Sequence, residues 1–343
     1  MIISRTPYRL SLFGGGTDYV DWYSAHDSKV VAVAISRYCY ITVRNLPPFF
    51  PHHTRVVYSQ IESVVNHSEI DHPSVRACLE FLSCKGGLEI HHDGDLPARS
   101  GIGSSSAFTV GLLNALYCLR GVSIGPADLA RDAVFVEQEL LKEPVGVQDQ
   151  VISAHGGMQV LSLTKANGVV ARPLQISDDY RKYLEESILF GFTGVERLST
   201  EFTVKIIESI KAGLLDDYLG EITSIANSGI KGLQQECDIR ELGRLLVCNW
   251  DLKKQLSPKL TTDNADDLIS TAIKAGAFGG KLMGAGGSGF FYVLADKSHH
   301  ESIKQSLPNV NVWVPINFEM SGSVVWSLDQ ANQNPHTAVN ESA

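Results

Sequence analysis

The run at residues 97–107, Pro-Ala-Arg-Ser-Gly-Ile-Gly-Ser-Ser-Ser-Ala, constrains the fold more than any other segment of the chain. It follows a strand-like stretch at residues 88–92 and opens an apolar, helix-like stretch at residues 107–119. Gly101 and Gly103 have no Cβ, so the backbone can turn tightly and approach a ligand closely. The N–H groups and the positive dipole end of the following helix would then face that ligand. The pattern therefore predicts a strand–loop–helix unit that cradles phosphate groups.

Three consecutive hydroxyls, at Ser104, Ser105 and Ser106, add donors for phosphate oxygens and a candidate ligand for Mg²⁺. An ordinary N-capped helix after a glycine turn is the plainer interpretation, because serine is a favoured N-cap residue. One cap needs one hydroxyl, however, and this segment supplies three. We therefore expect a polyphosphate cradle built from Pro97, Arg99, Ser100, Gly101, Gly103, Ser104, Ser105 and Ser106.

The better-known phosphate-binding patterns do not fit the chain. A Walker A loop needs Gly-x4-Gly-Lys-Ser/Thr. The nearest candidate ends in Gly280-Lys281-Leu282, with Ala275 where the first glycine belongs. The dinucleotide fingerprint needs an acidic residue about 20 positions after its glycines, whereas the first acid here, Asp128, stands at an expected helix start. The protein-kinase elements His-Arg-Asp and Asp-Phe-Gly are absent from the sequence.

The composition narrows the class of protein. A chain of 343 residues with 44% hydrophobic and 20% charged residues suits two globular domains around a cleft. Its net charge of -9 argues against a nucleic-acid partner, which normally meets a basic face. No apolar run approaches the roughly 20 residues that span a bilayer, and the N-terminus resembles no signal peptide. The six cysteines show no Cys-x-x-Cys spacing. We therefore expect a cytoplasmic protein with free thiols and no membrane contact.

The hydrophobic pattern predicts a first half of mixed strands and helices and a second half that is mainly helical. Strands are expected at residues 30–35, 38–44, 88–92, 158–163, 169–174, 188–192, 290–294, 310–315 and 323–328. Helices are expected at residues 75–82, 107–119 and 127–141, and through most of the segment that ends at Ile273. A domain boundary near residue 180 and a polar tail at residues 330–343 complete this prediction.

The run at residues 97–107 resembles the Pro-x3-Gly-Leu-Gly-Ser-Ser motif of the GHMP kinases, the superfamily of galactokinase, homoserine kinase, mevalonate kinase and phosphomevalonate kinase. Residues 6–19, Thr-Pro-Tyr-Arg-Leu-Ser-Leu-Phe-Gly-Gly-Gly-Thr-Asp-Tyr, resemble the family's first motif. Residues 281–290, Lys-Leu-Met-Gly-Ala-Gly-Gly-Ser-Gly-Phe, resemble its third. The three motifs stand in the family's order and span nearly the whole chain.

This resemblance implies an α+β, two-domain GHMP kinase fold with the active site in the cleft. Residues 1–180 would form the ATP-binding N-terminal domain, which is similar to domain 2 of ribosomal protein S5. Residues 181–329 would form a ferredoxin-like α+β C-terminal domain, followed by the polar tail at residues 330–343. The implied cofactors are ATP and Mg²⁺.

The resemblance also implies roles for individual side chains. Asp149, in Gly-Val-Gln-Asp, would be the catalytic base, although a lone Asp is more often a turn or helix-cap residue. Glu137 lies twelve positions earlier, the spacing of the magnesium-binding Glu in galactokinases, and would bind Mg²⁺ with Ser105. Glu139 is a competing ligand for the metal. The plainer interpretation of Glu137 is a solvated surface charge, as most helix glutamates are. Arg9 would hold the acceptor hydroxyl and the transferring phosphoryl group, or would be a plain arginine at a sheet edge.

The first motif bears on the acceptor. Asp18 matches the sugar-binding Asp of galactokinases, whose carboxylate accepts hydrogen bonds from vicinal hydroxyls. Gly15 and Gly16 replace the Glu-His pair of galactokinases, which makes galactose a poor match and leaves room for a bulkier sugar. Gly284 and Gly286 would let the third motif pack against the phosphate loop and the sugar.

These motif variants are similar to those of bacterial heptose kinases, which phosphorylate C1 of D-glycero-α-D-manno-heptose 7-phosphate on the way to GDP-heptose. A 1,7-bisphosphate for capsule or other surface glycan would be the product. Arg197, in a segment that resembles heptose kinases, is then the expected ligand of the 7-phosphate, with Arg99 and Lys281 as alternatives. A fucokinase-like or other sugar-1-kinase and a non-catalytic sugar sensor are the rival functions. The expected partners are a nucleotide and a sugar phosphate, and a homodimer is left open.

Overall fold

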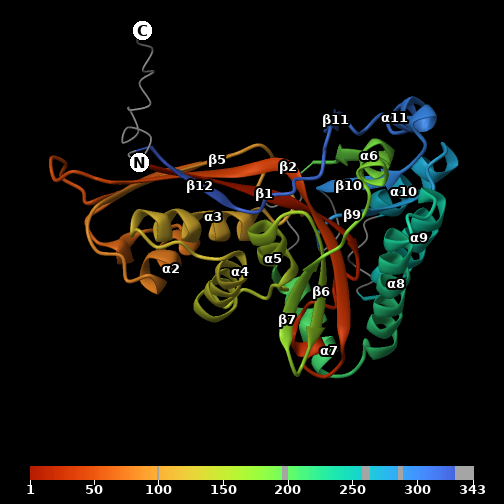
Figure 1. Cartoon of the computed structure of the whole chain (residues 1–343), viewed down its shortest axis with the longest axis horizontal. Helices are drawn as coiled ribbons and strands as arrows, with labels where there is room; N and C mark the ends of the chain where they lie inside the picture. The colour runs from red at the N-terminus through yellow and green to blue at the C-terminus, as the bar shows by residue number, and fades with distance from the viewer. Residues whose placement is uncertain (99, 195–199, 257–262, 285–288, 329–343) are drawn as a thin grey trace, which may run out of the picture.

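The computed structural model describes residues 1–98, 100–194, 200–256, 263–284 and 289–328. Within these residues the chain forms an eight-stranded and a four-stranded β-sheet, each covered by helices (Figure 1). The larger sheet has the order β12-β1-β2-β5-β3-β4, with β6 joined to β2 and β7 joined to β6. The smaller sheet has the order β11-β8-β10-β9. The predicted α+β class is confirmed.

Two long antiparallel strands, β1 (Ile2–Phe13) and β2 (Ser28–Asn45), form the centre of the larger sheet. The first part of β2 pairs with β6 (Met158–Thr164), and its last part pairs with β5 (Leu88–Gly94). The two strands expected at residues 30–35 and 38–44 are therefore one strand. A register shift between Pro7 and Tyr8 of β1 lies opposite the interruption between them.

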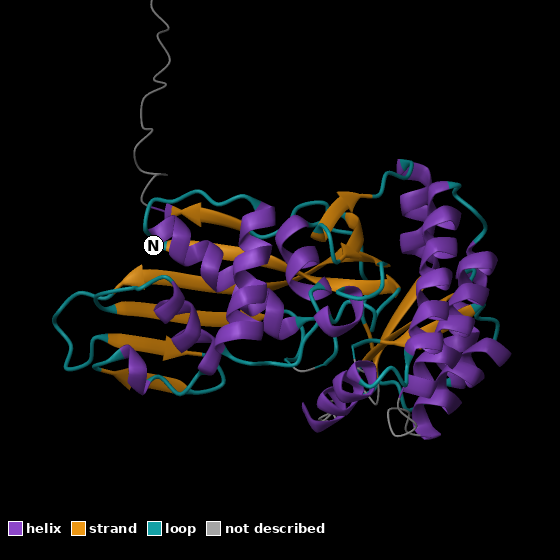
Figure 2. Ribbon diagram, turned by 90° about the horizontal axis from the view of Figure 1, so that it is seen from below, coloured by secondary structure: helices purple, strands orange, loops and turns teal. Residues whose placement is uncertain are grey.

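Helices cover one face of this sheet (Figure 2). They are α2 (Pro73–Phe81), α3 (Ser104–Leu119), α4 (Pro126–Phe135) and α5 (Gln148–His155). Residues 106–116 of α3 are all buried, as suits a helix that packs between a sheet and other helices. The single helix expected at residues 127–141 changes at Val136 into a π-helical turn, Val136–Leu140. Such turns are rare and occur frequently at functional sites.

The other elements of the larger sheet's half are short. They are α1 (Val20–Tyr23), β3 (Thr54–Val57), β4 (Ile61–Val64), a 3₁₀ turn at His67–Glu69 and β7 (Gly168–Pro173).

The smaller sheet and its helices form the second half. The helices are α6 (Asp178–Ser187), α7 (Thr200–Lys211), α8 (Asp216–Gln234), α9 (Ile239–Leu256), α10 (Asp263–Lys274), a 3₁₀ turn at Lys297–His299 and α11 (His300–Ser306). The strands are β8 (Ile188–Phe192), β9 (Gly279–Leu282), β10 (Phe290–Leu294) and β11 (Val312–Trp313). The predicted boundary at residue 180 falls inside α6.

The last strand returns to the larger sheet. β12 (Val324–Ser327) pairs antiparallel with the start of β1, from Ile2 opposite Ser327 to Arg5 opposite Val324. Asn114 of α3 donates a hydrogen bond of 3.0 Å to the Ser323 carbonyl just before this strand. The range expected for the second domain, residues 181–329, therefore ends in the first sheet. The tail at residues 330–343 lies outside the described residues.

The end of β1 is packed against the second half of the chain. Phe13 is buried, and its ring meets α8 at Gly229, where a Cβ would lie 2.5 Å from the ring. Tyr292 of β10 donates a hydrogen bond of 3.3 Å to the Ser11 carbonyl. Functional side chains near the C-terminal end of β1 are therefore positioned by both sheets.

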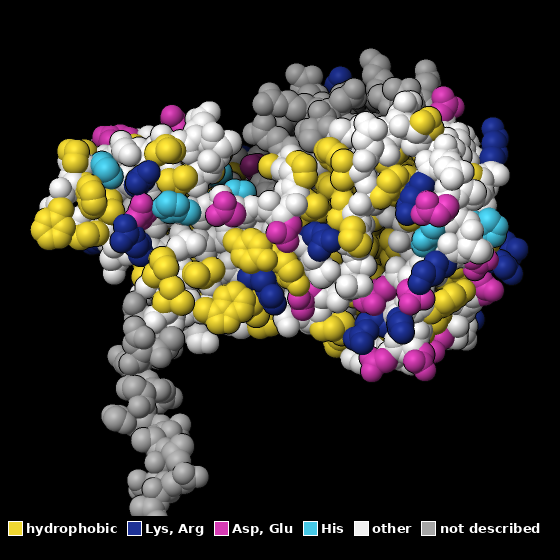
Figure 3. All heavy atoms as spheres, turned by 90° about the horizontal axis from the view of Figure 1, so that it is seen from above, with side chains coloured by type: hydrophobic (Ala, Val, Ile, Leu, Met, Phe, Trp, Pro, Cys, Tyr) yellow, Lys and Arg dark blue, Asp and Glu magenta, His cyan; other side chains and the backbone are white. Residues whose placement is uncertain are grey.

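On the face seen in Figure 3, lysine and arginine side chains are scattered among acidic ones rather than gathered in one patch. This agrees with the acidic balance of the sequence.

The contact at Gly229 yields a stability prediction with a matched control. Gly229→Ala forces a methyl group into the Phe13 ring and should lower the free energy of unfolding by about 1–3 kcal/mol. Gly220→Ala on the same helix meets nothing within 4 Å and should raise it by up to about 1 kcal/mol through helix propensity. Urea unfolding of both variants provides the measurement. Equal changes in the two variants would show that the packing argument is wrong.

Candidate active site

The phosphate loop has the conformation expected from its glycines. Gly101 and Gly103 adopt φ values of +86° and +74°, which L side chains rarely adopt, and α3 begins at the next residue, Ser104. A Cβ on Gly103 would lie 3.0 Å from Oδ2 of Asp149. The loop therefore passes directly against the expected catalytic carboxylate.

The third motif packs against this loop, backbone to backbone. A Cβ on Gly284 would lie 2.7 Å from the Cα of Gly101, and one on Gly289 would lie 2.5 Å from the Ser100 carbonyl oxygen. Phe290 also donates its N–H to that carbonyl, at 3.0 Å. The third motif therefore lies directly on the loop, as expected of Gly284. Gly286 and Arg99 lie outside the described residues.

The Ser100 hydroxyl serves the loop itself, because it is turned back to donate a 2.6 Å hydrogen bond to the Pro97 carbonyl. Pro97 is exposed, Ser100 is buried, and Ser104 is half-buried at the start of α3.

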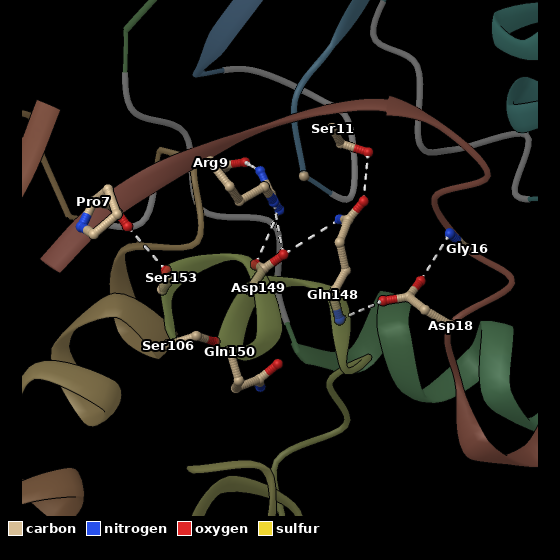
Figure 4. Close-up of polar contacts among 12 residues, drawn as sticks. Pro7, Arg9, Ser11, Gly16, Asp18, Ser106, Gln148, Asp149, Gln150 and Ser153 are labelled. Carbon is tan, nitrogen blue, oxygen red and sulfur yellow. Dashed lines mark hydrogen bonds and ion pairs between the residues drawn. The ribbon is translucent and has the colours of Figure 1, made fainter. Parts of the chain in front are cut away.

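Arg9 joins β1, the phosphate loop and α5 (Figure 4). Its Nε and Nη2 donate hydrogen bonds of 2.6 and 2.9 Å to the two carboxylate oxygens of Asp149. Its Nη1 donates one of 2.7 Å to the Gly101 carbonyl. Arg9 is 4% exposed, so this forked ion pair is largely shielded from water. In the sheet, Arg9 lies opposite Ala34 of β2, and its side chain lines the cavity described below.

Gln148 links the two carboxylates of the site (Figure 4). Its Oε1 accepts a 2.8 Å hydrogen bond from Ser11, and its Nε2 donates one of 3.3 Å to Asp149. Its backbone N–H donates one of 3.2 Å to Oδ2 of Asp18. The Ser11 hydroxyl fixes the orientation of the amide, so Gln148 holds Asp149 and Asp18 at a set separation.

Asp18 lies in a tight cage. Besides the bond from Gln148, it accepts a 3.1 Å hydrogen bond from the N–H of Gly16. A Cβ on Gly146 would lie 2.0 Å from its Oδ2, so a glycine is required there. Burial raises the pKa of Asp18, and the charge of Asp149 raises it further, while the backbone hydrogen bonds lower it.

A cavity of about 210 Å³ lies in front of these groups. Ligand pockets for drug-sized molecules measure roughly 300–1,000 Å³, so this cavity suits a smaller ligand. Predicted residues that line it are Arg9, Gly15, Gly16, Asp18, Asp149, Lys281 and Gly284. Lining residues that sequence reasoning did not assign to the site are Ser11, Tyr19, Pro144, Val145, Gly146, Gln148, Thr203, Ile206 and Lys253.

Glu137, in the π-helical turn, is 0% exposed, so it is not a solvated surface charge. Its Oε2 accepts hydrogen bonds from Ser106 at 2.9 Å and from Gln150 at 2.5 Å. Its Oε1 is buried and has no hydrogen-bond partner among the described residues. Burial raises the pKa of Glu137 to about 7, although Ser106, Thr109 and Gln150 oppose the shift.

The serine that contacts Glu137 is Ser106 rather than Ser105, whose side chain is exposed on the first turn of α3. Glu139, the competing ligand, points away from the site: its side chain is 57% exposed and pairs with Lys142 at 2.9 Å. The unpartnered Oε1 of Glu137 suits a hard cation such as Mg²⁺, which binds one or two carboxylates and keeps water and phosphate oxygens.

Two family models match the chain: GHMP kinases N terminal domain at residues 73–157 and GHMP kinases C terminal at residues 230–312. The D-glycero-alpha-D-manno-heptose 7-phosphate kinase of Campylobacter jejuni is 28% identical, over 95% of this chain and 99% of the relative. The chain belongs to the GHMP kinases.

Other GHMP kinases are similar over most of the chain. The galactokinase of Pyrococcus furiosus is 26% identical over 89% of this chain and 92% of its own length. The crystal structure of a D-glycero-D-manno-heptose 1-phosphate kinase from Bacteriodes thetaiotaomicron superposes with a TM-score of 0.76 at 22% identity. That superposition covers 96% of this chain and 99% of the neighbour. These matches agree with the α+β fold and with the N- and C-terminal domains of the GHMP kinases.

In this GHMP kinase, all three motifs meet at one place, as the resemblance implied. The roles given to their residues remain predictions, and Arg197 lies outside the described residues. Gln148 stood beside Asp149 in the quoted motif but carried no signal of its own, and Lys253 stands in none of the motifs. No helix among the described residues is both long and apolar enough to cross a membrane.

Glu137 gives a pH-dependence prediction for the metal-free protein. Its carboxyl has a pKa of about 7 in the native state against 4.5 ordinarily, so between these values the native state holds a proton that the unfolded chain lacks. The free energy of unfolding should therefore fall as pH rises through this window, by on the order of 3 kcal/mol in total.

Glu137→Gln should remove this slope, and the exposed control Glu139→Gln should keep it. Urea unfolding at several pH values in the presence of a chelator measures the slope. A slope in Glu137→Gln equal to that of the wild type would contradict the assignment.

Proposed function

We propose that this sugar kinase transfers the γ-phosphoryl group of ATP to the C1 hydroxyl of D-glycero-α-D-manno-heptose 7-phosphate. The observation that carries the proposal is the single cavity in which the Arg9–Asp149 pair, Asp18 and the Gly15–Gly16 turn face one another beside the phosphate loop. The product, a 1,7-bisphosphate, would serve GDP-heptose synthesis for capsule or other surface glycan. A cytoplasmic location and a homodimeric state remain predictions.

Each part of phosphoryl transfer has a candidate in the site. The loop around Gly101 and Gly103 and the first turn of α3 would hold the ATP phosphates. Asp149, whose side chain is 25% exposed, would take the proton of the acceptor hydroxyl. Arg9 orients that carboxylate and would stabilise the charge that develops on the transferring group.

A bound Mg²⁺ would neutralise charge on the β- and γ-phosphates. Glu137 would hold it through Oε1, with a hydroxyl from Ser105 or Ser106 beside it. Of these two serines, Ser106 is already hydrogen-bonded to the carboxylate, and Ser105 is exposed where a nucleotide would approach.

The acceptor end of the cavity supports a sugar. Asp18, held by two backbone N–H groups, keeps acceptor capacity for vicinal hydroxyls. Gly15 and Gly16 contribute no side chain to the wall, which suits a sugar longer than a hexose. The similarity to the Campylobacter jejuni heptose 7-phosphate kinase favours the same substrate here. A fucokinase-like activity on a free hexose is the second candidate.

Asp149→Asn tests the proposed base. Asn keeps the size of the side chain but accepts no proton, so kcat should fall by about 100-fold or more while the Kd for ATP changes little. Single-turnover kinetics measure the fall in the rate of phosphoryl transfer, and nucleotide titration measures the Kd for ATP. A variant that keeps most of its kcat would exclude a dedicated base and favour positioning alone.

A turnover panel tests the substrate. D-glycero-D-manno-heptose 7-phosphate, mannose, fucose and galactose are compared side by side in a coupled ADP-release assay. The heptose phosphate should have the highest kcat/KM, because the other sugars offer no phosphate to the basic side chains of the cavity. A comparable kcat/KM for a free hexose would remove the heptose assignment, and ATP binding without any turnover would favour a sugar sensor.

A further inference from the structure

Two lysines from the second half of the chain reach the cavity of the first. Lys253 comes from α9 and Lys281 from β9. The Nζ of Lys253 donates a 2.5 Å hydrogen bond to the Gly284 carbonyl. The Nζ of Lys281, in a side chain that is 1% exposed, lies 3.5 Å from the Ser11 hydroxyl and 3.4 Å from the Leu12 carbonyl. Both ammonium groups are thus held by neutral oxygens.

Neither lysine has an ion-pair partner among the described residues, although two carboxylates line the same cavity. Asp149 already accepts two hydrogen bonds from Arg9, and Asp18 accepts two from backbone N–H groups. Three cations thus face two carboxylates, which leaves an excess of positive charge.

Burial and the neighbouring positive charges lower the pKa of both lysines. Burial lowers the pKa of Lys253 to about 8, and Arg9 lowers it further against the opposing charges of Asp18 and Asp149. Burial lowers the pKa of Lys281 well below its ordinary value, and the charges of Lys253 and Arg9 act in the same direction. Buried like charges are costly unless an opposite charge is placed between them.

We propose that Lys253, assisted by Lys281, binds an anionic phosphate monoester on the acceptor and makes the enzyme select phosphorylated over unphosphorylated sugars. The proposal deepens the proposed function and rests on it. A phosphate dianion in the cavity would offset the excess charge and give both ammonium groups strong acceptors. Lys253 would then bind the acceptor's phosphate, which is the role that the sequence suggested for Arg197.

The cavity adjoins the phosphate loop, so the anion has two possible sources: the acceptor's phosphate and the γ-phosphoryl group of ATP. We commit to the acceptor, because Lys253 and Lys281 line the same cavity as Gly15, Gly16 and Asp18. The two sources give different kinetic results, since only the first depends on which acceptor is used.

The chain supplies a matched control in the adjacent residue. Lys254 also stands on α9, but its Nζ pairs with Asp251 at 2.9 Å and Asp266 at 3.3 Å. Lys254→Met therefore removes the same charge from the same helix without touching the cavity. Lys253→Arg restores the charge and tests rescue. Melting temperatures of all variants establish that each one folds.

The KM for D-glycero-D-manno-heptose 7-phosphate and for unphosphorylated D-glycero-D-manno-heptose is measured at saturating ATP, and the KM for ATP is measured at a saturating acceptor concentration. Lys253→Met should raise KM for the phosphorylated acceptor by about 10- to 100-fold, as expected when a charged hydrogen-bond donor is lost. KM for the unphosphorylated heptose and for ATP should change by less than about threefold. Lys253→Arg should recover part of the loss, and Lys254→Met should behave as wild type.

An equal rise in KM for both acceptors, a fall in kcat with both acceptors, or a Lys253→Met variant that matches Lys254→Met would each overturn the inference. A fall in kcat alone would assign Lys253 to the transferred phosphoryl group. Failure of the wild type to use the phosphorylated heptose would instead contradict the proposed function, so the two failures are distinguishable.

Discussion

The forked ion pair between Arg9 and Asp149 is the interaction on which the rest of the site depends. One guanidinium group ties the middle of β1 to the first turn of α5 and, through the Gly101 carbonyl, to the phosphate loop. Two segments that lie more than ninety residues from Arg9 in the sequence are thereby fixed at one point. Because the fork is planar and 4% exposed, it sets the direction of the carboxylate as well as its distance. A lysine could supply the charge there but not this geometry.

Around that pair, each sheet contributes a different kind of group. The larger sheet and its helices carry the carboxylates and the glycine loop, while the smaller sheet and α9 carry the two lysines that close the cavity. Ligand pockets occur preferentially where two domains of a chain meet. Here the division also explains why the third motif is rich in glycine, since its backbone must lie against Gly101 for the opposite walls to meet.

The sequence predicted those features that depend on local backbone chemistry. The glycines of the phosphate loop were identifiable because a left-handed turn before a helix requires them, and Glu137 and Asp149 were found through their spacing in a family pattern. Ser105 and Ser106 could not be told apart, because which of them faces Glu137 depends on where α3 begins and how it rotates against the π-helical turn. Lys253 was missed for a different reason: a lysine on an amphipathic helix is usually solvated, and only the folded position of α9 brings its amine to the cavity.

The pairing of β12 with β1 has a consequence for how the protein is made. The first strand of the chain is completed on its outer side by one of the last, and the two are separated by about 320 residues. During synthesis from the N-terminus, the start of β1 must therefore keep unsatisfied N–H and C=O groups at an open edge until the whole second half has emerged. An unpaired edge of this kind is a template for pairing with another chain. The first residues of β1 are thus protected from such pairing only after the segment that forms β12 has been translated.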